Sequence, residues 1–305
     1  MTAGSAEEFL AHRGRLFGLA YRLLGSAEEA EDALQDAFLR WSAADRDAIE
    51  APGGWLAKVV TNLCLNRLTS ARARREAYVG PWLPEPVVTA ADELGPLDTA
   101  EQRDLVSLGL LRLMETLTPT ERAVFVLREA FGYAHREIAE LVSLTEANSR
   151  QLHARARRRL ARPATPRVVD RAGWRALVER FLRAAAEGDL ESLEAMLADD
   201  VVSVADGGGR INAARKPVAG RARVARYLAG VLGRGSGARL DLGASYAEVN
   251  GAPAALGWAG ESLVGALVLS VDDAGRVAEL HIAANPDKLR FAAEQLSHPV
   301  ELLGS

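Results

Sequence analysis

The sequence predicts a multidomain protein in which two all-α segments, the second with a helix-turn-helix, precede an α+β domain. Apolar residues recur at helical spacing between residues 9 and 68 and again between residues 98 and 162. Strand-like runs separated by turn-forming residues begin only after Pro166. The chain has 305 residues, more than the roughly 100 to 200 residues of one common domain, so two or three domains are expected.

The first helical segment contains a clear apolar stripe. Its members follow helical spacing and are Ala30, Ala33, Leu34, Ala37, Phe38 and Trp41. Ser26 and Glu29 have the spacing of a capping box, so this helix is expected to begin near Ala27. A break at Pro52-Gly53-Gly54 precedes a second helix, residues 55–68, which runs into the basic residues 72–75.

A proline-rich stretch follows the first helical segment. Residues 81–86 contain three prolines, too many for a helix, and are expected to be extended. We therefore expect residues 77–100 to form a linker.

The second helical segment contains two helices separated by a short break. Thr118 is the expected N-cap of a helix over residues 120–129, with Pro119 in its first turn. Helices over residues 134–142 and 146–160 then flank residues 143–145. This arrangement predicts a helix-turn-helix.

The last third of the chain combines helices with strands. Helices are expected over residues 174–197 and 218–232, and strand-like runs are interrupted by glycine-rich turns at residues 206–209, 250–251 and 272–275. Asn250-Gly251 is typical of a tight hairpin turn. We expect a curved antiparallel sheet wrapped around helices.

Charge is unevenly distributed along the chain. The net charge is −4, which argues against a free-standing protein that coats nucleic acid. Residues 67–80 carry 4 basic and 1 acidic side chains and residues 122–162 carry 9 and 4, whereas residues 163–305 carry 16 and 18. We recognise no comparable clustering in that last part.

Other features of composition exclude several classes of protein. No apolar stretch approaches the roughly 18 residues of a membrane span, and Cys64 is the only cysteine, so no intrachain disulfide can form. The N-terminus lacks the order of a signal peptide. We expect a soluble, cytoplasmic protein without a membrane partner.

The expected helix 146–160 has a face suited to DNA. Its apolar face would bury Ser149, Leu152, Ala156 and Leu160. The side chains left outside are Asn148, Arg150, Gln151, Arg155 and, in the following basic run, Arg158. Arginine and amide side chains pair with base edges in the major groove, and further arginines suit phosphates. The alternative is a solvated basic end of a helix, favoured by the helix dipole.

The helix 55–68 carries side chains suited to single-stranded bases. They are Trp55, Asn62, Asn66 and Arg67. Aromatic and amide groups stack on and hydrogen-bond to unstacked bases. A single tryptophan at the start of a helix is, however, more often part of a core.

Two parts of the chain resemble sigma factors. Residues 31–38 and 55–62 resemble sigma region 2, and residues 117–122, 150–152 and 155–157 resemble sigma region 4. Region 3 is missing, as in the extracytoplasmic function group. The resemblance implies that Asp32, Gln35 and Asp36 help to hold core RNA polymerase, that residues of helix 55–68 engage the opened promoter DNA, and that helix 146–160 reads the upstream element.

Three further segments resemble the SigJ-like subgroup, whose members carry a fused SnoaL-like α+β domain. They are residues 82–86, 206–209 and 285–289. The resemblance implies that these motifs regulate the sigma regions through contacts between domains. The residues concerned are Trp82, Pro84, Asp206, Gly207, Gly208, Gly209, Asn285, Pro286, Asp287 and Lys288. Ser143 departs from the subgroup, where glycine is frequent in the helix-turn-helix bend.

The resemblance gives the expected domain boundaries. Region 2 is expected over residues 5–76, the linker over 77–100, region 4 over 101–163, the SnoaL-like cone over 170–292 and a tail over 293–305.

We considered two other functions. An enzyme on the SnoaL-like fold would need a carboxylate or imidazole in an apolar cone, and Asp241, Tyr246 and His281 are candidates by residue type. These are single residues scattered over a sheet, and Asp241 and Tyr246 have opposite parity on one expected strand. A ligand-sensing repressor or activator would use the helix-turn-helix alone.

We therefore predict a sigma factor that binds core RNA polymerase and directs promoter-specific initiation, modulated by its C-terminal domain. We expect no catalytic residue, metal or cofactor. An unknown small-molecule ligand of the C-terminal domain is left open.

Overall fold

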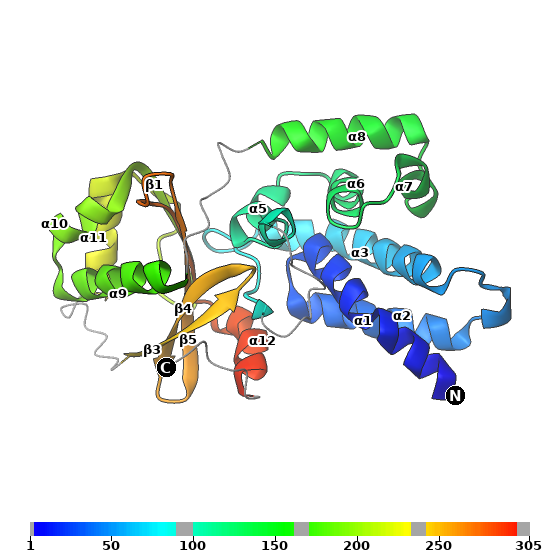
Figure 1. Cartoon of the computed structure of the whole chain (residues 1–305), viewed down its shortest axis with the longest axis horizontal. Coiled ribbons are helices and arrows are strands. Elements are labelled where there is room, and N and C mark those ends of the chain that lie inside the picture. The colour runs from blue at the N-terminus through cyan, green and yellow to red at the C-terminus, as the bar shows by residue number, and fades with distance from the viewer. Residues whose placement is uncertain (1–2, 90–99, 162–170, 233–241, 298–305) are drawn as a thin grey trace. The chain divides into compact units, whose positions relative to one another are not determined.

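The computed structural model describes residues 3–89, 100–161, 171–232 and 242–297 (Figure 1). Their contacts divide them into two compact units. The first unit consists of residues 3–77 and 100–161, and the second of residues 78–89, 171–232 and 242–297. In the described ranges, no helix is long and apolar enough to cross a membrane.

The first part of the first unit consists of three long helices, α1 (Ala3–Leu24), α2 (Ala27–Ala43) and α3 (Pro52–Glu76), with a short 3-10 helix at Arg46–Ala48. The Ser26 hydroxyl accepts a hydrogen bond from the amide of Glu29, which confirms the predicted start of α2. The predicted stripe of α2 is buried except at Phe38, which is half-buried and lies edge-on to Phe9 with ring centroids 5.1 Å apart. Burial of this stripe packs α2 against α1.

Helix α3 is longer than the sequence predicts. It begins at Pro52, since proline needs no amide partner in a first turn, and it continues past Leu68 to Glu76. The glycines after Pro52 are therefore helical, and the expected break at Pro52-Gly53-Gly54 is a helix start.

Five shorter helices complete the first unit: α4 (Ala100–Asp104), α5 (Leu108–Met114), α6 (Pro119–Glu129), α7 (His135–Leu141) and α8 (Glu146–Arg159). Thr118 and Glu121 form a complete capping box at the start of α6. Helices α7 and α8 confirm the predicted helix-turn-helix. Ser143 in their turn has φ 55°, so serine adopts the left-handed backbone that the turn requires.

Arginines join the two groups of helices in the first unit. The buried Arg122 guanidinium of α6 donates to the backbone carbonyl of Arg22 at 3.2 Å and also pairs with Glu115. Arg75 of α3 pairs with the same Glu115 and donates to the carbonyl of Leu24. Both arginines thus satisfy carbonyls near the end of α1, which have no partner within a helix.

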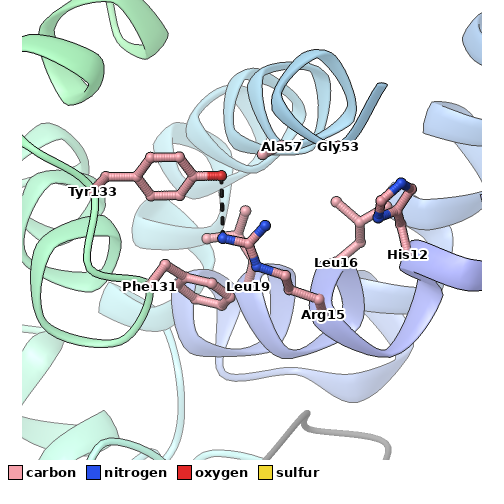
Figure 2. A pocket seen from close by; sticks show the side chains of 8 residues that line it. All are labelled: His12, Arg15, Leu16, Leu19, Gly53, Ala57, Phe131 and Tyr133. Atoms are coloured by element: carbon pink, nitrogen blue, oxygen red, sulfur yellow. Dashed lines mark hydrogen bonds between the residues drawn. The ribbon is translucent and has the colours of Figure 1, made fainter. Parts of the chain in front are cut away.

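A second contact between these helices uses aromatic rings (Figure 2). Arg15 of α1 lies 5.6 Å from the ring centre of Phe131 and 5.5 Å from that of Tyr133. Phe131 also faces Arg22 at 5.6 Å. Burial lowers the pKa of Arg22 to about 10. These cation–π contacts favour the packing of the α6–α7 loop on α1.

The second unit is built on one six-stranded sheet. Its strands are β1 (Leu197–Asp206), β2 (Val218–Ala219), β3 (Leu242–Val249), β4 (Ala252–Ala259), β5 (Ser262–Val271) and β6 (Val277–Ala283), in the order β2-β1-β6-β5-β4-β3. Asn250 and Gly251 both have positive φ in the two-residue turn between β3 and β4, which confirms the predicted hairpin. The expectation of a wholly antiparallel sheet is wrong, because β1 and β6 pair in parallel.

Two expected helices of this unit also need correction. The helix expected over residues 174–197 is two helices, α9 (Arg171–Glu187) and α10 (Leu190–Met196), since the chain turns at Gly188 with φ 73°. The helix expected from Val218 is α11 (Arg221–Leu232), because Val218 and Ala219 pair with β1 instead.

The two faces of the sheet are covered differently. Helices α9, α10 and α11 pack on one face around a core that includes Phe181, Leu193 and Leu280. The last described helix, α12 (Pro286–Ser297), packs on the other face (Figure 1). It extends five residues into the expected tail, whose remaining residues lie outside the described ranges.

Candidate functional site

The residues predicted to hold polymerase lie on α2. Asp32 and Gln35 are exposed and Asp36 is half-buried. Arg67 of α3 donates to Asp36 at 2.6 Å and to Asp32 at 3.4 Å. Burial lowers the pKa of Arg67, but its hydrogen bonds with Asp36 and Asp32 outweigh this effect and raise it overall. One predicted promoter contact thus shares an ion cluster with two predicted polymerase contacts.

The other predicted promoter contacts on α3 differ in exposure. Trp55 is half-buried, with its ring centre 5.6 Å from that of the fully buried Trp41. Asn62 is half-buried and Asn66 is exposed. Trp55 therefore packs against the core through one part of its ring and leaves another part accessible.

The faces of α8 match the prediction. Ser149, Leu152, Ala156 and Leu160 are buried, whereas Arg150, Gln151, Arg155 and Arg158 are exposed and Asn148 is half-buried. Arg150 pairs with Glu146 one turn earlier. An exposed row of arginine and amide side chains can reach base edges and phosphates together.

The buried Glu121 of α6 fixes the basic end of α8. Arg159 lies 2.7 Å from Glu121 and Arg155 lies 3.8 Å from it. Neither these ion pairs nor the capping-box role of Glu121 was predicted, and the ion-pair partners lie 34 and 38 positions away in the sequence.

Two histidines in the helix-turn-helix were also missed. His135 at the start of α7 lies 3.0 Å from the Ser149 hydroxyl, and His153 of α8 lies 2.6 Å from Glu129. The two rings are 5.4 Å apart. Burial lowers the pKa of His135, and the positive charges around it add to this effect. Helical periodicity could not predict these contacts, because their partners lie 14 and 24 positions apart on different helices.

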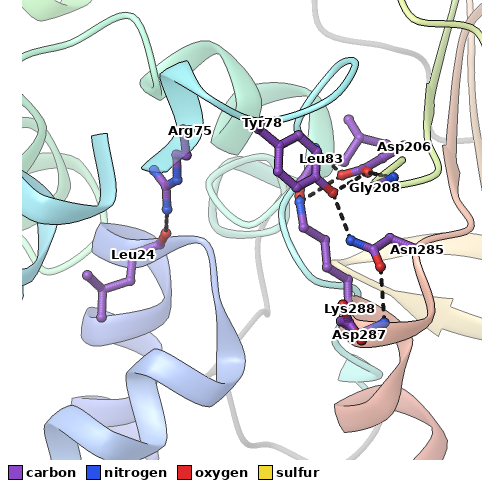
Figure 3. Close-up of polar contacts among 9 residues, drawn as sticks. All are labelled: Leu24, Arg75, Tyr78, Leu83, Asp206, Gly208, Asn285, Asp287 and Lys288. Atoms are coloured by element: carbon purple, nitrogen blue, oxygen red, sulfur yellow. Dashed lines mark hydrogen bonds and ion pairs between the residues drawn. The ribbon is translucent and has the colours of Figure 1, made fainter. Parts of the chain in front are cut away.

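The three motifs predicted to be regulatory, residues 82–86, 206–209 and 285–289, converge on Asp206 within the second unit (Figure 3). The fully buried Asp206 carboxylate accepts hydrogen bonds from the Tyr78 hydroxyl at 2.6 Å, the Leu83 amide at 2.8 Å and the Gly208 amide at 3.0 Å. The Lys288 ammonium lies 2.7 Å away. Four donors therefore surround one buried anion.

Lys288 is held in an aromatic cage. Its ammonium lies 4.1 Å from the centre of the Trp82 ring and 4.7 Å from that of Tyr78, and it donates to the carbonyl of Leu83. Such positions attract a cation to the faces of both rings. Burial raises the pKa of Tyr78, and its hydrogen bond to Asp206 adds to the effect.

Glycines permit the close approach at this cluster. Gly208 has φ +60°, and a Cβ there would lie 2.3 Å from the Asn285 amide nitrogen. A Cβ at Gly207 would lie 2.5 Å from the carbonyl oxygen of Ile211. Asn285 donates to the Tyr78 hydroxyl at 2.8 Å. Only glycine fits where the turn meets Asn285.

The remaining predicted regulatory residues lie around the same cluster. Pro84 is buried, and Pro286 begins α12. Asp287 is exposed and pairs with Arg210 at 3.0 Å. Gly209 is exposed, and a Cβ there would meet Val79 at 3.2 Å.

Residues 78–89, which we name the strap, are bonded to the second unit along their length. Val87 exchanges hydrogen bonds with Asn250, and Val88 exchanges hydrogen bonds with Gln295 of α12, at distances of 2.9 to 3.1 Å. Leu83, Val87 and Val88 have no exposed surface. The strap is part of this domain's core, although its sequence predicts a linker.

Tyr246 and His281, the two described residues among those considered for catalysis, lie on opposite faces of the sheet. Tyr246 packs against the core, edge-on to Trp174 at 6.2 Å, with Arg175 4.9 Å from its ring centre. His281 lies between Leu280 and Ile282, which belong to that core side, so it points to the opposite face. Asp241 lies outside the described residues. Within those residues, no group of three potential metal ligands occurs.

Comparisons with known proteins agree with the three parts of the chain. Residues 9–74 match sigma-70 region 2, residues 107–160 match sigma-70 region 4 and residues 178–281 match the SnoaL-like domain. The ECF RNA polymerase sigma factor SigJ of Mycobacterium tuberculosis is 37% identical over 289 residues, which cover 92% of each chain. The chain belongs to the extracytoplasmic function (ECF) sigma factors.

Further relatives of this ECF sigma factor are similar over nearly the whole chain. The probable ECF RNA polymerase sigma factor SigI of Mycobacterium tuberculosis is 34% identical, again over 92% of each chain. The crystal structure of SigJ from the same organism matches with a TM-score of 0.70 and 33% identity, covering 94% of this chain and 98% of that one. The resemblance predicted from the motifs is confirmed, and so is the fold class.

This ECF sigma factor directs promoter-specific transcription initiation. Its region 2 and region 4 are the parts by which sigma factors bind core RNA polymerase and promoter DNA. The sigma factor family is not catalytic.

Proposed function

We propose that the C-terminal domain of this sigma factor modulates initiation by holding the strap that connects region 2 to region 4. The observation that carries the proposal is the buried cluster of Asp206 and Lys288, which binds Tyr78, Trp82 and Leu83. A sigma factor contacts two promoter elements at once. A strap fixed to a folded domain limits the separations that its two ends can adopt, whereas a free linker does not.

We propose the following roles for the surfaces of the sigma regions. Asp32, Gln35 and Asp36 hold core polymerase, and Trp55, Asn62, Asn66 and Arg67 engage the opened promoter. Asn148, Arg150, Gln151, Arg155 and Arg158 contact the upstream element. The exposure of most of these side chains supports the assignment. The ion pairs of Arg67 with Asp32 and Asp36 suggest that promoter and polymerase contacts are coupled.

We further propose that the C-terminal domain has no catalytic activity of its own. Tyr246 and His281 face opposite sides of the sheet, and the core face is filled by apolar side chains. The same apolar filling gives no support to the hypothesis that a small molecule binds in this domain. The protein is expected in the cytoplasm, where transcription takes place.

The test is run-off transcription with purified core polymerase on promoters that differ only in the spacer between the two elements. Trp82→Ala removes one wall of the lysine cage and should loosen the strap. We expect this variant to keep its affinity for core polymerase but to initiate more evenly as the spacer is lengthened or shortened by a base pair or two. The starting promoter is selected from a genomic library with the unchanged protein.

Asp273→Ala is the matched control, because Asp273 is exposed in a turn of the same domain and lies outside the three motifs. Circular dichroism verifies the fold of both variants. If folded Trp82→Ala shows the same dependence on spacer length as the unchanged protein, the strap does not set the separation of the sigma regions and the proposal is wrong.

A further inference from the structure

One stretch of the C-terminal domain is basic throughout. Residues 207–240 contain eight basic and no acidic side chains. The near-equal numbers of basic and acidic residues over 163–305 conceal this cluster, so it was not predicted. Two of the eight, Arg234 and Arg239, lie outside the described residues. The other six are Arg210, Arg215, Lys216, Arg221, Arg223 and Arg226.

The loop that carries the first three of these residues is ordered by its own hydrogen bonds. The amides of Arg210 and Ile211 donate to the carbonyl of Gly207 at 2.9 and 3.0 Å. Farther along, the amide of Ala214 donates to the hydroxyl of Tyr227 at 3.3 Å. The loop is therefore fixed against α11, and Arg215 and Lys216, which follow Ala214 directly, are exposed.

Helix α11 adds two arginines beside this loop. Its buried side consists of Val224, Ala225 and Leu228. Arg223 and Arg226 are exposed and stand one turn apart. Arg223 is also one turn from Tyr227, the residue that binds the loop. Arg215, Lys216, Arg223 and Arg226 thus form one surface, which we name the basic surface.

Carboxylates pair with the other two described basic residues of this stretch but not with these four. Arg210 pairs with Asp287 at 3.0 Å, and Arg221 pairs with Asp199 at 2.8 Å. Within the described ranges, no carboxylate oxygen lies within 4.0 Å of the side-chain nitrogens of the basic surface. The nearby helices α9 and α10 carry Glu187 and Glu191, and neither is paired with it. Four uncompensated positive charges lie together on an ordered surface.

We propose that the basic surface binds the phosphate backbone of duplex promoter DNA. Clustered arginine and lysine side chains bind phosphates without reading the base sequence. Binding is favoured because it releases counterions from the DNA. Beside Arg223 and Arg226, the exposed residues of α11 are Ala222, Gly230 and Val231, and Ile211 is exposed on the loop. None of these four residues is an aromatic side chain of the kind that anchors protein interfaces.

The inference rests on the proposed function in one respect, namely that the two sigma regions bring promoter DNA to the protein. The net charge of −4 keeps the free chain from binding duplexes strongly. The basic surface would therefore add to the affinity of a complex already assembled on the promoter.

Lysine footprinting tests this contact directly, because the lysines of the chain are Lys58, Lys216 and Lys288. The complex with core polymerase is acetylated with and without promoter duplex, and the modified lysines are identified by mass spectrometry. We expect DNA to protect Lys216 several-fold. Lys288, which is buried, serves as the internal standard for an intact fold. Equal acetylation of Lys216 with and without DNA would overturn the proposal, as would full protection by polymerase alone.

A matched pair of variants gives the second test. Arg223→Ala with Arg226→Ala removes two charges of the basic surface, and Arg180→Ala with Arg183→Ala removes two exposed, equally spaced charges of α9. Binding of each polymerase complex to a promoter fragment is measured over a range of salt concentrations. The slope of log affinity against log salt should become shallower by about 2 for the first variant. The α9 variant should keep the original slope.

The two tests separate this inference from the proposed function. Protection of Lys216 by DNA, together with an unchanged dependence on spacer length in folded Trp82→Ala, would reject the proposed role of the strap and keep the basic surface. Initiation that persists with an unprotected Lys216 and an unchanged salt slope would reject the basic surface alone.

Discussion

The ammonium of Lys288 lies 2.7 Å from a carboxylate oxygen of Asp206, and these side chains are 9% and 0% exposed. An ion pair removed from water in this way is held in place because either partner alone would be a buried, uncompensated charge. The pair connects α12 to the end of β1, and its further contacts reach the strap.

Asp206→Ala should therefore destabilise the second unit severely. It leaves Lys288 buried without a counterion and removes the acceptor of Tyr78 and Leu83. We expect the free energy of unfolding of this unit to fall by about 3 to 5 kcal/mol. Urea denaturation measures the loss. Asp287→Ala, which removes an exposed pair, should cost about 0 to 1 kcal/mol; equal losses in both variants would contradict the prediction.

Arg150→Ala and Gln151→Ala should weaken initiation in a way that depends on promoter sequence. Both side chains are exposed on α8. Loss of a base contact costs about 1 to 3 kcal/mol at the matching base pair and little elsewhere. Arg158→Ala should act evenly on all promoters, since a phosphate contact carries no sequence information. Transcription from a library of upstream sequences distinguishes these patterns, and three identical profiles would show that the base-reading face is misassigned.

Glu115→Ala should destabilise the first unit. Glu115 pairs with Arg75 and with Arg122, whose side chain is 2% exposed. Without it the buried guanidinium has no counterion, so we expect a loss of about 3 to 5 kcal/mol in the free energy of unfolding. The control is Glu140→Ala, which removes an exposed pair with Arg136 one turn away and should cost about 0.5 kcal/mol or less. Thermal and urea unfolding of both variants check the difference.

The helix-turn-helix should lose stability at mildly acidic pH through His135. Burial lowers the pKa of His135, so the folded protein favours the neutral ring. Its stabilising contribution is complete above the ordinary histidine pKa of about 6.5 and is lost as the pH falls through the lower pKa of the folded state. Unfolding of the unchanged protein and of His135→Gln should be compared at several pH values. A pH dependence that is the same in both would show that His135 is not responsible.

Ser143→Gly should stabilise the turn of the helix-turn-helix. Ser143 is exposed and has φ 55°, a left-handed conformation that costs about 1 to 2 kcal/mol for a residue with a Cβ. Glycine removes this cost but has more freedom in the unfolded chain. A net gain of about 0.5 to 1 kcal/mol in the free energy of unfolding is expected. Denaturation of the two proteins side by side measures it, and a loss of stability would contradict the argument.

Local signals predicted much of the helical fold. The caps at Ser26 and Thr118 fix where α2 and α6 begin, and the spacing of apolar residues in α8 gives its buried face. These features depend on residues only three or four positions apart. The hairpin at Asn250 is equally local, because its two residues alone select the turn.

Features that depend on distant residues could not be predicted in this way. Alternation of side chains shows that a strand exists but not which strand it pairs with, so the parallel pairing of β1 with β6 was missed. A proline-rich segment is extended whether it is free or docked, so residues 78–89 were expected to be a linker. The sequence also gives no sign that Lys288 is buried, because its partner Asp206 lies 82 positions away.

The docking of the strap has a consequence for synthesis on the ribosome. The strap emerges before region 4, yet its partners Asp206, Asn250 and Gln295 are made much later. Domains generally fold in the order in which they are synthesised. Region 2 and region 4 can therefore fold while the segment between them is still unbound, and translation must reach α12 before the strap is fully secured. A nascent chain halted before β1 would carry both sigma regions without that restraint.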